Sequence, residues 1–191
     1  MFVPSCSLCR GWDPTGAPSF CSRPRARFAL TCPRCESSSI GAGAGLEKLQ
    51  QESQALGLGD HARFLGALYD EEQLAPWFKV AGAFCVPAML GLPLLHAFGY
   101  GLPVVTGDNT QVHGPEIEAL RHGENGLLYL DGSVAALAAA LRRILENETL
   151  RRDMSAAALR TVEERYTIDR MVEGMEAAVR FCAANGTRPG T

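Results

Sequence analysis

The sequence contains no uninterrupted hydrophobic stretch of the length that a membrane-spanning helix needs. Its most apolar part, residues 80–105, has no Asp, Glu, Lys or Arg, but prolines and glycines divide it into pieces of strand and short-helix length. A spanning helix requires about 20 uninterrupted apolar residues, so we expect no transmembrane segment. The first residues also lack a continuous apolar run after a basic region. We therefore expect no signal peptide and a reducing, cytoplasmic compartment.

The sequence also lacks the net positive charge that attracts nucleic acid or anionic lipid. The formal net charge is −3, although residues 1–39 alone carry +3 and the remainder carries −6. We therefore expect no nucleic-acid partner. The chain of 191 residues, of which 47% are hydrophobic and 20% charged, is typical of one globular domain with a sizeable core.

Five of the seven cysteines lie in the first 35 residues, a segment also rich in Ser, Pro and Arg. Residues 1–39 show no helical or alternating apolar period, which predicts a disordered leader or a misread upstream region. Two CxxC pairs in this segment could ligate a tetrahedral zinc ion, and they are formed by Cys6, Cys9, Cys32 and Cys35. The residues between the two CxxC pairs do not alternate between apolar and polar as the strands of a hairpin would. We therefore favour a disordered or misread leader over a zinc-binding segment.

From Ile40 onward, short apolar strands alternate with amphipathic helices. Strands are predicted at residues 63–66, 83–86, 103–106 and 126–130, and helices at 46–56, 71–79 and 90–100. Strands and helices that alternate over such short intervals predict an α/β fold, in which helices flank a parallel sheet. The expected domain covers residues 40–183, and residues 184–191 are expected to form a disordered tail.

A helical C-terminal part is predicted after the sheet. Ser133 can cap a helix with one apolar face, formed by Val134, Leu137, Leu141, Ile144 and Leu145. The last helix has an apolar stripe formed by Ile168, Met171, Val172, Met175, Val179 and Cys182. Stripes at this spacing are typical of core packing, so we expect both helices to bury them and assign the methionines no cofactor role.

The turn after the strand at residues 83–86 is the first candidate ligand site. In open parallel sheets, ligands bind beyond the carboxyl ends of strands, where helix N-termini present free N–H groups. Backbone amides of residues 88–92 could hold an anion there; these residues are Ala88, Met89, Leu90, Gly91 and Leu92. His96 could reach the same rim, or it could instead be a helix histidine whose ring is satisfied by a backbone carbonyl.

The polar loop at residues 106–126 is the second candidate, because a loop directly after a strand often carries function. His113 and Glu116 are its candidate ligand contacts. Pro115 also fits a helix start, with Glu116 as a stabilising charge in the first turn, so structure and ligand contact both remain open. The glycine-rich residues 41–45 precede a helix but lack the G-x-G-x-x-G spacing of a dinucleotide loop.

Several segments, in the right order, resemble a known family. The segment IGAGAGLEKLQ looks like a glycine turn and helix, and HARFLGALYDEEQLAPWF looks like an FLG strand with its helix. VPAMLGLPLLHAFGYGLPVVT resembles the signature P-x-x-E-G-F-G-L-x-x-L-E-A-x-A-x-G-x-P-V-V, and EIEALRHGENGLLY resembles E-I-x-x-x-G-x-N-G-L-L. Residues 40 to about 181 therefore resemble the C-terminal, donor-binding lobe of retaining GT-B glycosyltransferases of family 4, also called group 1.

The sequence departs from this family at a pair of glutamates. Family members usually place two of them eight positions apart in the signature, one near the donor sugar and phosphate, the other on the ribose hydroxyls. Ala88 and His96 occupy these positions here. A neutral imidazole can hydrogen-bond to a ribose hydroxyl, so His96 can replace the second glutamate, whereas Ala88 offers no polar side chain.

The resemblance implies transfer of a hexosyl group from a nucleotide-diphosphate sugar to an unknown acceptor, with retention and without an obligatory metal. It implies donor contacts at Gly66, near the base, at residues 88–92 and at His96. The family's acceptor-binding lobe and its basic pair for the donor diphosphate are not recognisable in residues 1–39. The alternative is a noncatalytic, truncated donor lobe that binds a nucleotide or a protein partner without turnover.

Overall fold

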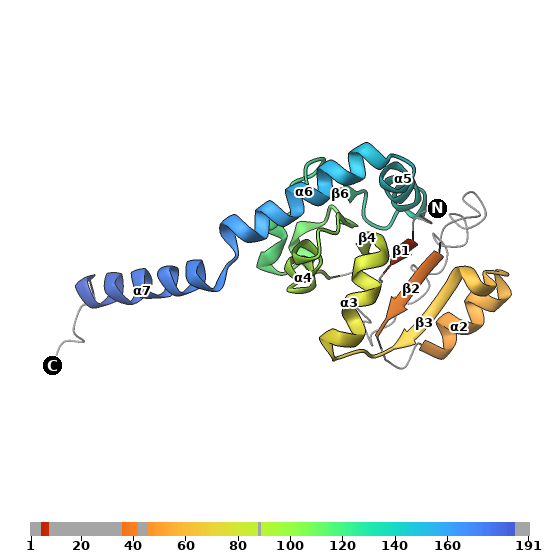
Figure 1. Ribbon diagram of the computed structural model, residues 1–191, viewed down its shortest axis with the longest axis horizontal. Coiled ribbons are helices and arrows are strands. Elements are labelled where there is room, and N and C mark those ends of the chain that lie inside the picture. Colours follow the sequence, from red (N-terminus) through yellow and green to blue (C-terminus); the bar gives the residue numbers. More distant parts are fainter. Residues whose placement is uncertain (1–4, 8–35, 42–45, 88, 186–191) are drawn as a thin grey trace.

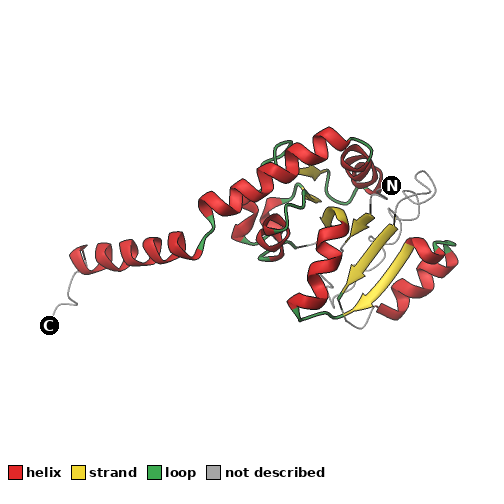
Figure 2. Ribbon diagram, in the orientation of Figure 1, coloured by secondary structure: helices red, strands yellow, loops and turns green. Residues whose placement is uncertain are grey.

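A computed structural model of the protein describes residues 5–7, 36–41, 46–87 and 89–185. Six strands form one sheet: β1 (Ser5–Ser7), β2 (Glu36–Ile40), β3 (Ala62–Gly66), β4 (Ala81–Val86), β5 (Val104–Gly107) and β6 (Gly126–Tyr129). The α-helices are α2 (Leu46–Ala55), α3 (Glu71–Val80), α4 (Pro93–Gly99), α5 (Val134–Leu145), α6 (Glu148–Arg165) and α7 (Ile168–Asn185). Short 3₁₀ helices are η1 (Gly59–His61), η2 (Thr110–Val112) and η3 (Pro115–Ala119). Figures 1 and 2 show helices around a central sheet.

All strand pairs are parallel, and the sheet order is β3-β2-β1-β4-β5-β6. This confirms the predicted α/β class. The chain runs outward from β1 through β2 to β3, and α3 then carries it back across the sheet to β4 on the other side of β1. The order of the strands therefore reverses between β1 and β4, and all carboxyl ends lie along one edge of the sheet.

The sheet begins earlier in the sequence than predicted. Residues 5–7 and 36–39, which we expected in a disordered leader, lie in β1 and β2, while residues 1–4 and 8–35 are outside the described residues. The sequences SCS and ESSS have no alternating or continuous apolar residues, so hydrophobic patterning could not predict that they form strands. They are strands because β4 and β3 supply hydrogen-bonded partners on either side. Ser37 is buried in β2, and its hydroxyl donates to the carbonyl of His61.

Local sequence sets the starts of the helices. The Asp70 side chain accepts a hydrogen bond from the amide of Glu72 at the start of α3, and Ser133 accepts one from the amide of Ala136 at the start of α5. Both caps use free N–H groups of the first turn. The predicted helix starts at residues 71 and 134 are confirmed, whereas α4 begins at Pro93, three residues later than predicted.

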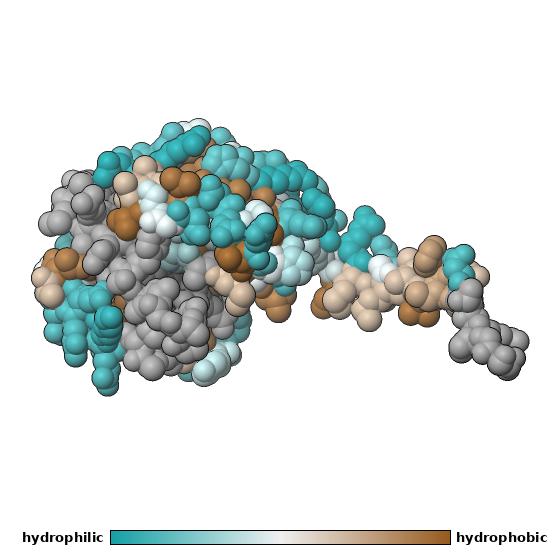
Figure 3. Space-filling view, turned by 180° about the vertical axis from the view of Figure 1, so that it is seen from behind, coloured by the Kyte–Doolittle hydropathy of each residue, from teal (hydrophilic) through white to brown (hydrophobic). Residues whose placement is uncertain are grey.

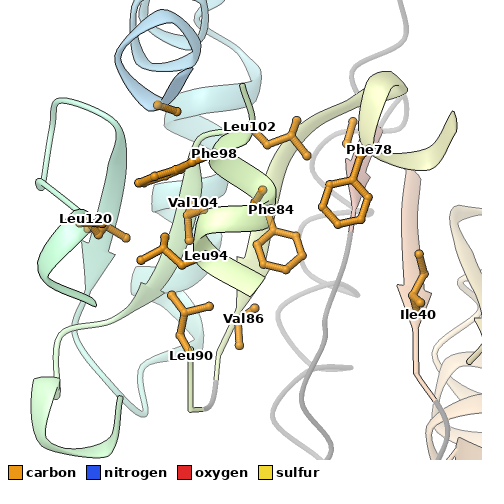
Figure 4. Packing of buried hydrophobic residues seen from close by; sticks show 14 of the residues in the cluster. Ile40, Phe78, Phe84, Val86, Leu90, Leu94, Phe98, Leu102, Val104 and Leu120 are labelled. Atoms are coloured by element: carbon orange, nitrogen blue, oxygen red, sulfur yellow. The ribbon is translucent and has the colours of Figure 1, made fainter. Parts of the chain in front are cut away.

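Two hydrophobic clusters cover the two faces of the sheet. Phe84 and Val86 of β4 enter the cluster that α3 and α4 close, and Ala83 and Cys85 enter the cluster beneath α5. This alternation is the two-residue period of a strand with both faces buried. Figure 4 shows the first cluster, in which Phe84 lies between Phe78 and the side chains of α4.

The last helix departs from the prediction. The stripe on α7 was expected to be buried, but no residue of α7 is buried, and Ile168 and Met175 are 76% and 63% exposed. Figure 1 shows α7 projecting away from the sheet, and Figure 3 shows hydrophobic residues along it. The chain supplies no surface against this helix within the described residues. The tail expected at residues 184–191 also differs, because α7 continues to Asn185; residues 186–191 are outside the described residues.

None of the helices in the described part of the chain is both long enough and apolar enough to cross a membrane.

Candidate functional site at the carboxyl edge of the sheet

The loops that follow β3, β4 and β5 each carry exposed apolar side chains. Tyr69 follows β3, Met89 and Leu92 follow β4, and Val112 follows β5; their exposed fractions are 88%, 71%, 70% and 47%. Because the sheet is parallel, these loops leave the same edge. Apolar side chains that are exposed together mark surfaces that a ligand or another part of a protein covers. This edge is therefore the candidate site.

The turn between β4 and α4 has fewer free amides than predicted. The Leu90 amide donates to Nδ1 of His113 (3.1 Å), and the Leu90 carbonyl accepts from the amide of Gly114 (2.8 Å). Leu90 is buried, so its amide is not available to an anion. The amides of Gly91 and Leu92 donate to no acceptor among the described residues. Ala88 lies outside the described residues.

His113 joins two loops of this edge. Its Nδ1 accepts from Leu90, so in the neutral ring Nε2 carries the proton and donates to the carbonyl of Gly107 (3.0 Å). Both ring nitrogens are therefore used by the backbone of the chain. This favours the structural alternative for His113 over direct ligand contact.

Glu116 borders the same turn from η3. Pro115 starts this element as predicted, although the element is a 3₁₀ helix. A Cβ atom placed on Gly91 would lie 3.7 Å from Oε2 of Glu116, so the carboxylate faces the backbone of the turn. A carboxylate in this position can accept a hydrogen bond from a hydroxyl group.

The far end of the loop after β5 is fixed by Asn125, which is fully buried. Its amide group donates to the carbonyl of Ala119 (2.9 Å) and to Oγ1 of Thr161 in α6 (3.1 Å), and its Oδ1 accepts from the amide of Arg121 (2.7 Å). These hydrogen bonds tie the loop that carries His113 and Glu116 to the helical part of the domain.

His96 lies in a cluster of polar and aromatic side chains between α3 and α4. Its Nε2 is 3.1 Å from Oε1 of Glu71, and the hydroxyl of Tyr100 donates to the same oxygen. Phe78 packs behind the cluster, with its ring centroid 4.8 Å from that of His96 and 5.1 Å from that of Tyr100. The expected alternative, a His96 ring satisfied by a backbone carbonyl, is not what the structure has, because its partner is a side chain.

The cluster shifts two pKa values in opposite directions. The hydrogen bond from Tyr100, followed by that from His96, holds the pKa of Glu71 below its ordinary value, against an opposing effect of burial. The same hydrogen bond to Glu71 raises the pKa of Tyr100. At neutral pH the site therefore contains an ionised carboxylate and a protonated phenol.

Sequence reasoning missed Glu71 and Tyr100 as parts of this site. Glu71 opens the helix predicted at residues 71–79, where a negative charge stabilises the first turn, and this local role does not indicate a ligand contact. Tyr100 follows His96 by four residues and caps the C-terminal end of α4, so the two side chains lie close together on one side of this helix. That spacing was visible in the sequence, but the identity of the partner was not, since Glu71 is 25 residues away from His96.

Gly66 ends β3 with φ +72°, a conformation that favours glycine. Its carbonyl accepts from the amide of Gly41 (2.8 Å), so it couples the ends of β2 and β3. Gly66 lies five residues before Glu71, at the start of the loop that leads to α3.

Most of the cysteines of the less favoured zinc alternative lie outside the described residues. The backbone of Cys6 lies in β1, and Cys9, Cys32 and Cys35 lie outside the described residues. Within the described ranges, no three His, Cys, Asp or Glu side chains are grouped so that they could hold a metal ion.

A family model described as "Glycosyl transferases group 1" matches residues 38–161. This range is more than half of the chain and contains the end of β2, all of β3 to β6 and the loops of the edge described above. The chain belongs to the glycosyl transferases group 1 family. The resemblance in the sequence is thus confirmed, and the match begins within the segment that we expected to be a leader.

Among curated proteins, a phosphatidyl-myo-inositol mannosyltransferase of Mycobacterium leprae is 38% identical over 124 residues. The alignment covers 63% of this chain and 32% of that protein. The chain therefore spans about a third of the length of this glycosyltransferase relative.

Solved structures show the same fold. TarM of S. aureus, crystallised in a complex that contains UDP, has a TM-score of 0.81 at 13% identity, and the match covers 92% of this chain and 35% of that one. The C-terminal domain of the group 1 glycosyl transferase LpcC of Francisella tularensis has a TM-score of 0.73 at 20% identity, and the match covers 86% of this chain and 87% of that one. The fold is thus the Rossmann-like C-terminal half of GT-B glycosyltransferases.

Proposed function

We propose that this chain is the donor-binding lobe of a glycosyltransferase that transfers a hexosyl group from a nucleotide-diphosphate sugar, with retention of anomeric configuration. The observation that carries the proposal is the family match across the carboxyl edge of the sheet. The mannosyltransferase relative and the UDP complex of TarM support it. The reaction breaks the bond between C1 of the sugar and the diphosphate. A bond from C1 to an acceptor hydroxyl then forms on the same face, and the hydroxyl proton leaves with the diphosphate.

In this proposal, different positions along the carboxyl edge of the sheet bind different parts of the donor. The diphosphate binds at the amides of Gly91 and Leu92, the base lies near Gly66, and the ribose lies at the cluster around His96. Glu116 accepts a hydrogen bond from a hydroxyl of the transferred sugar. No metal ion is required, because backbone N–H groups serve the diphosphate.

We propose that the acceptor side of the reaction comes from a further lobe or a partner chain. Two observations support this: the chain spans about a third of the length of its mycobacterial relative, and α7 presents an apolar stripe that no described residue covers. An amphipathic helix outside a core is typical of a surface that packs against another unit. We propose a cytoplasmic location, where nucleotide sugars serve as donors.

The first test is isothermal titration of the purified chain with nucleoside diphosphates and their sugar conjugates. Specific binding supports a working donor lobe and identifies its base. A folded sample that binds none of them contradicts the proposal.

The alternative function is a donor lobe that binds a nucleotide or a protein partner without turnover. An assay of sugar transfer, first with this chain alone and then with candidate acceptor lobes, separates the two functions. Binding without transfer under every combination would support the noncatalytic lobe.

A further inference from the structure

The carboxylate of Glu71 is held at one oxygen and open at the other. Oε1 accepts from Tyr100 and lies 3.1 Å from Nε2 of His96, while no donor among the described residues reaches Oε2. The side chain is 58% exposed, and that of His96 is 31% exposed. Two donors on one oxygen restrict rotation of the carboxylate, and the lone pairs of Oε2 stay available to a ligand.

The charge around Glu71 favours neutral hydroxyl groups as its ligands. The loops after β3 and β4, residues 67–70 and 87–92, contain no Lys or Arg, so no cation from them neutralises this carboxylate. Glu71 stays ionised at neutral pH, because its hydrogen bonds lower its pKa. An ionised carboxylate repels phosphate but accepts strong, charge-assisted hydrogen bonds from hydroxyl groups.

We propose that Glu71, oriented by His96 and Tyr100, accepts hydrogen bonds from the ribose hydroxyls of the donor nucleotide. This inference rests on the proposed function and adds to it a residue from α3 that makes the specific contact. His96 then acts beside Glu71 as the residue that positions the carboxylate. Phe78 of α3, which is buried, packs against the rings of both His96 and Tyr100 and so helps to fix the two donors.

A purely structural role is the competing explanation, in which Glu71 only ties α3 to α4. The substitution Glu71→Gln separates the two roles. The amide side chain keeps an acceptor oxygen for Tyr100 but lacks the negative charge that strengthens a bond to ribose. Glu72 provides the matched control, because it is the next residue, it is also exposed, and its side chain makes no described contact.

The experiment measures the preference for ribose by isothermal titration. The probes are UDP, GDP and ADP with their 2′,3′-dideoxy analogues, and the proteins are the wild type, Glu71→Gln and Glu72→Gln. For the diphosphate that binds, we expect the wild type and Glu72→Gln to prefer the ribose form by about tenfold or more, as hydrogen bonds to a charged group should give. We expect Glu71→Gln to reduce this preference to about threefold or less.

Tyr100→Phe is a second variant, which keeps the charge of Glu71 and removes one of the two donors that orient it. We expect its preference for ribose to lie between those of the wild type and Glu71→Gln. Circular dichroism melts confirm that each variant is folded.

The outcomes separate this inference from the proposed function. A wild type that binds none of the diphosphates overturns the proposed function and the inference with it. A wild type that binds but does not prefer ribose, or a Glu71→Gln protein that keeps the full preference, overturns only the role of Glu71.

Discussion

The helices α5 and α7 have similar amphipathic patterns but opposite environments. In α5 the apolar residues Leu137, Leu141 and Ile144 are buried against the sheet, whereas in α7 the corresponding stripe is exposed. An apolar stripe shows that a helix has a face that favours burial, but it does not show whether the partner lies in the same chain. The same distinction applies at the site, where His113 is satisfied by backbone groups of the chain and His96 lies in a half-exposed cluster.

The largest expected effect comes from truncating one apolar side chain in α5 and one in α7, which tests whether the two stripes differ in burial. We expect Ile144→Ala in α5 to lower the free energy of unfolding by about 2–5 kcal/mol, because it leaves a cavity in the core. Met175→Ala in α7 should change it by less than about 0.5 kcal/mol, since Met175 is exposed. Urea unfolding of the two variants measures both values. Equal losses would contradict the difference between the helices.

The comparison of the histidines starts with His113. We expect His113→Ala to lower the free energy of unfolding by about 1–3 kcal/mol, because the amide of buried Leu90 loses its acceptor. Gln111→Ala is the control, since Gln111 lies in the same loop, is exposed and has no described partner. Thermal and urea unfolding measure the effect. If the His113→Ala protein were as stable as the Gln111→Ala control, this result would contradict a structural role for His113.

Substitution of His96 should affect ligand binding more than the free energy of unfolding, the reverse of what we expect for His113. We expect His96→Ala to weaken binding of the nucleoside diphosphate by about 1 kcal/mol or more, because the hydrogen bond that positions Glu71 at the ribose is lost. Its effect on unfolding should be smaller than that of His113→Ala, because its bond to Glu71 is half-exposed. Calorimetric titration, with Lys79→Ala as a surface control on α3, measures the affinity. Unchanged affinity would remove His96 from the site.

The smallest expected effect is the pH dependence of the bond between Glu71 and Tyr100. The pKa of Glu71 is lowered from about 4.5, so its stabilising contribution is present above that pH and is lost as pH falls through the lowered pKa. The pKa of Tyr100 is raised from about 10.0, so its contribution is present below that pH and is lost as pH rises through the raised pKa. Because Glu71 is mostly exposed, each contribution should be a few tenths of a kcal/mol.

Melting temperatures of the wild type and Glu71→Gln, measured from about pH 3 to about pH 11 so that both ordinary pKa values are crossed, test this dependence. We expect the wild type to be the more stable of the two in the middle of the range, with the difference shrinking at both ends. A difference that stays constant with pH would show that the charge of Glu71 contributes nothing to stability.

Much of the fold followed from patterns within short stretches of sequence. The alternation of strands and helices predicted the parallel α/β sheet, and Asp70 and Ser133 marked helix starts that the structure confirms. Caps and apolar periods depend on residues within one or two turns, so the sequence alone determines them. The order of the motifs likewise indicated the family, which the family match confirms.

Tertiary structure alone decided which distant groups meet. The polar strands β1 and β2 depend on neighbouring strands for their ladders, and a serine-rich segment has no local period that reveals them. His96 bonds to Glu71, which lies 25 residues away along the sequence, and Nδ1 of His113 accepts from Leu90, which lies 23 residues away. Burial of a stripe depends on what lies opposite it, and for α7 the described residues of this chain provide nothing there. The sequence thus determined the elements and their faces, while the packing of the chain determined which faces and polar groups were satisfied and which were left for a ligand or a partner.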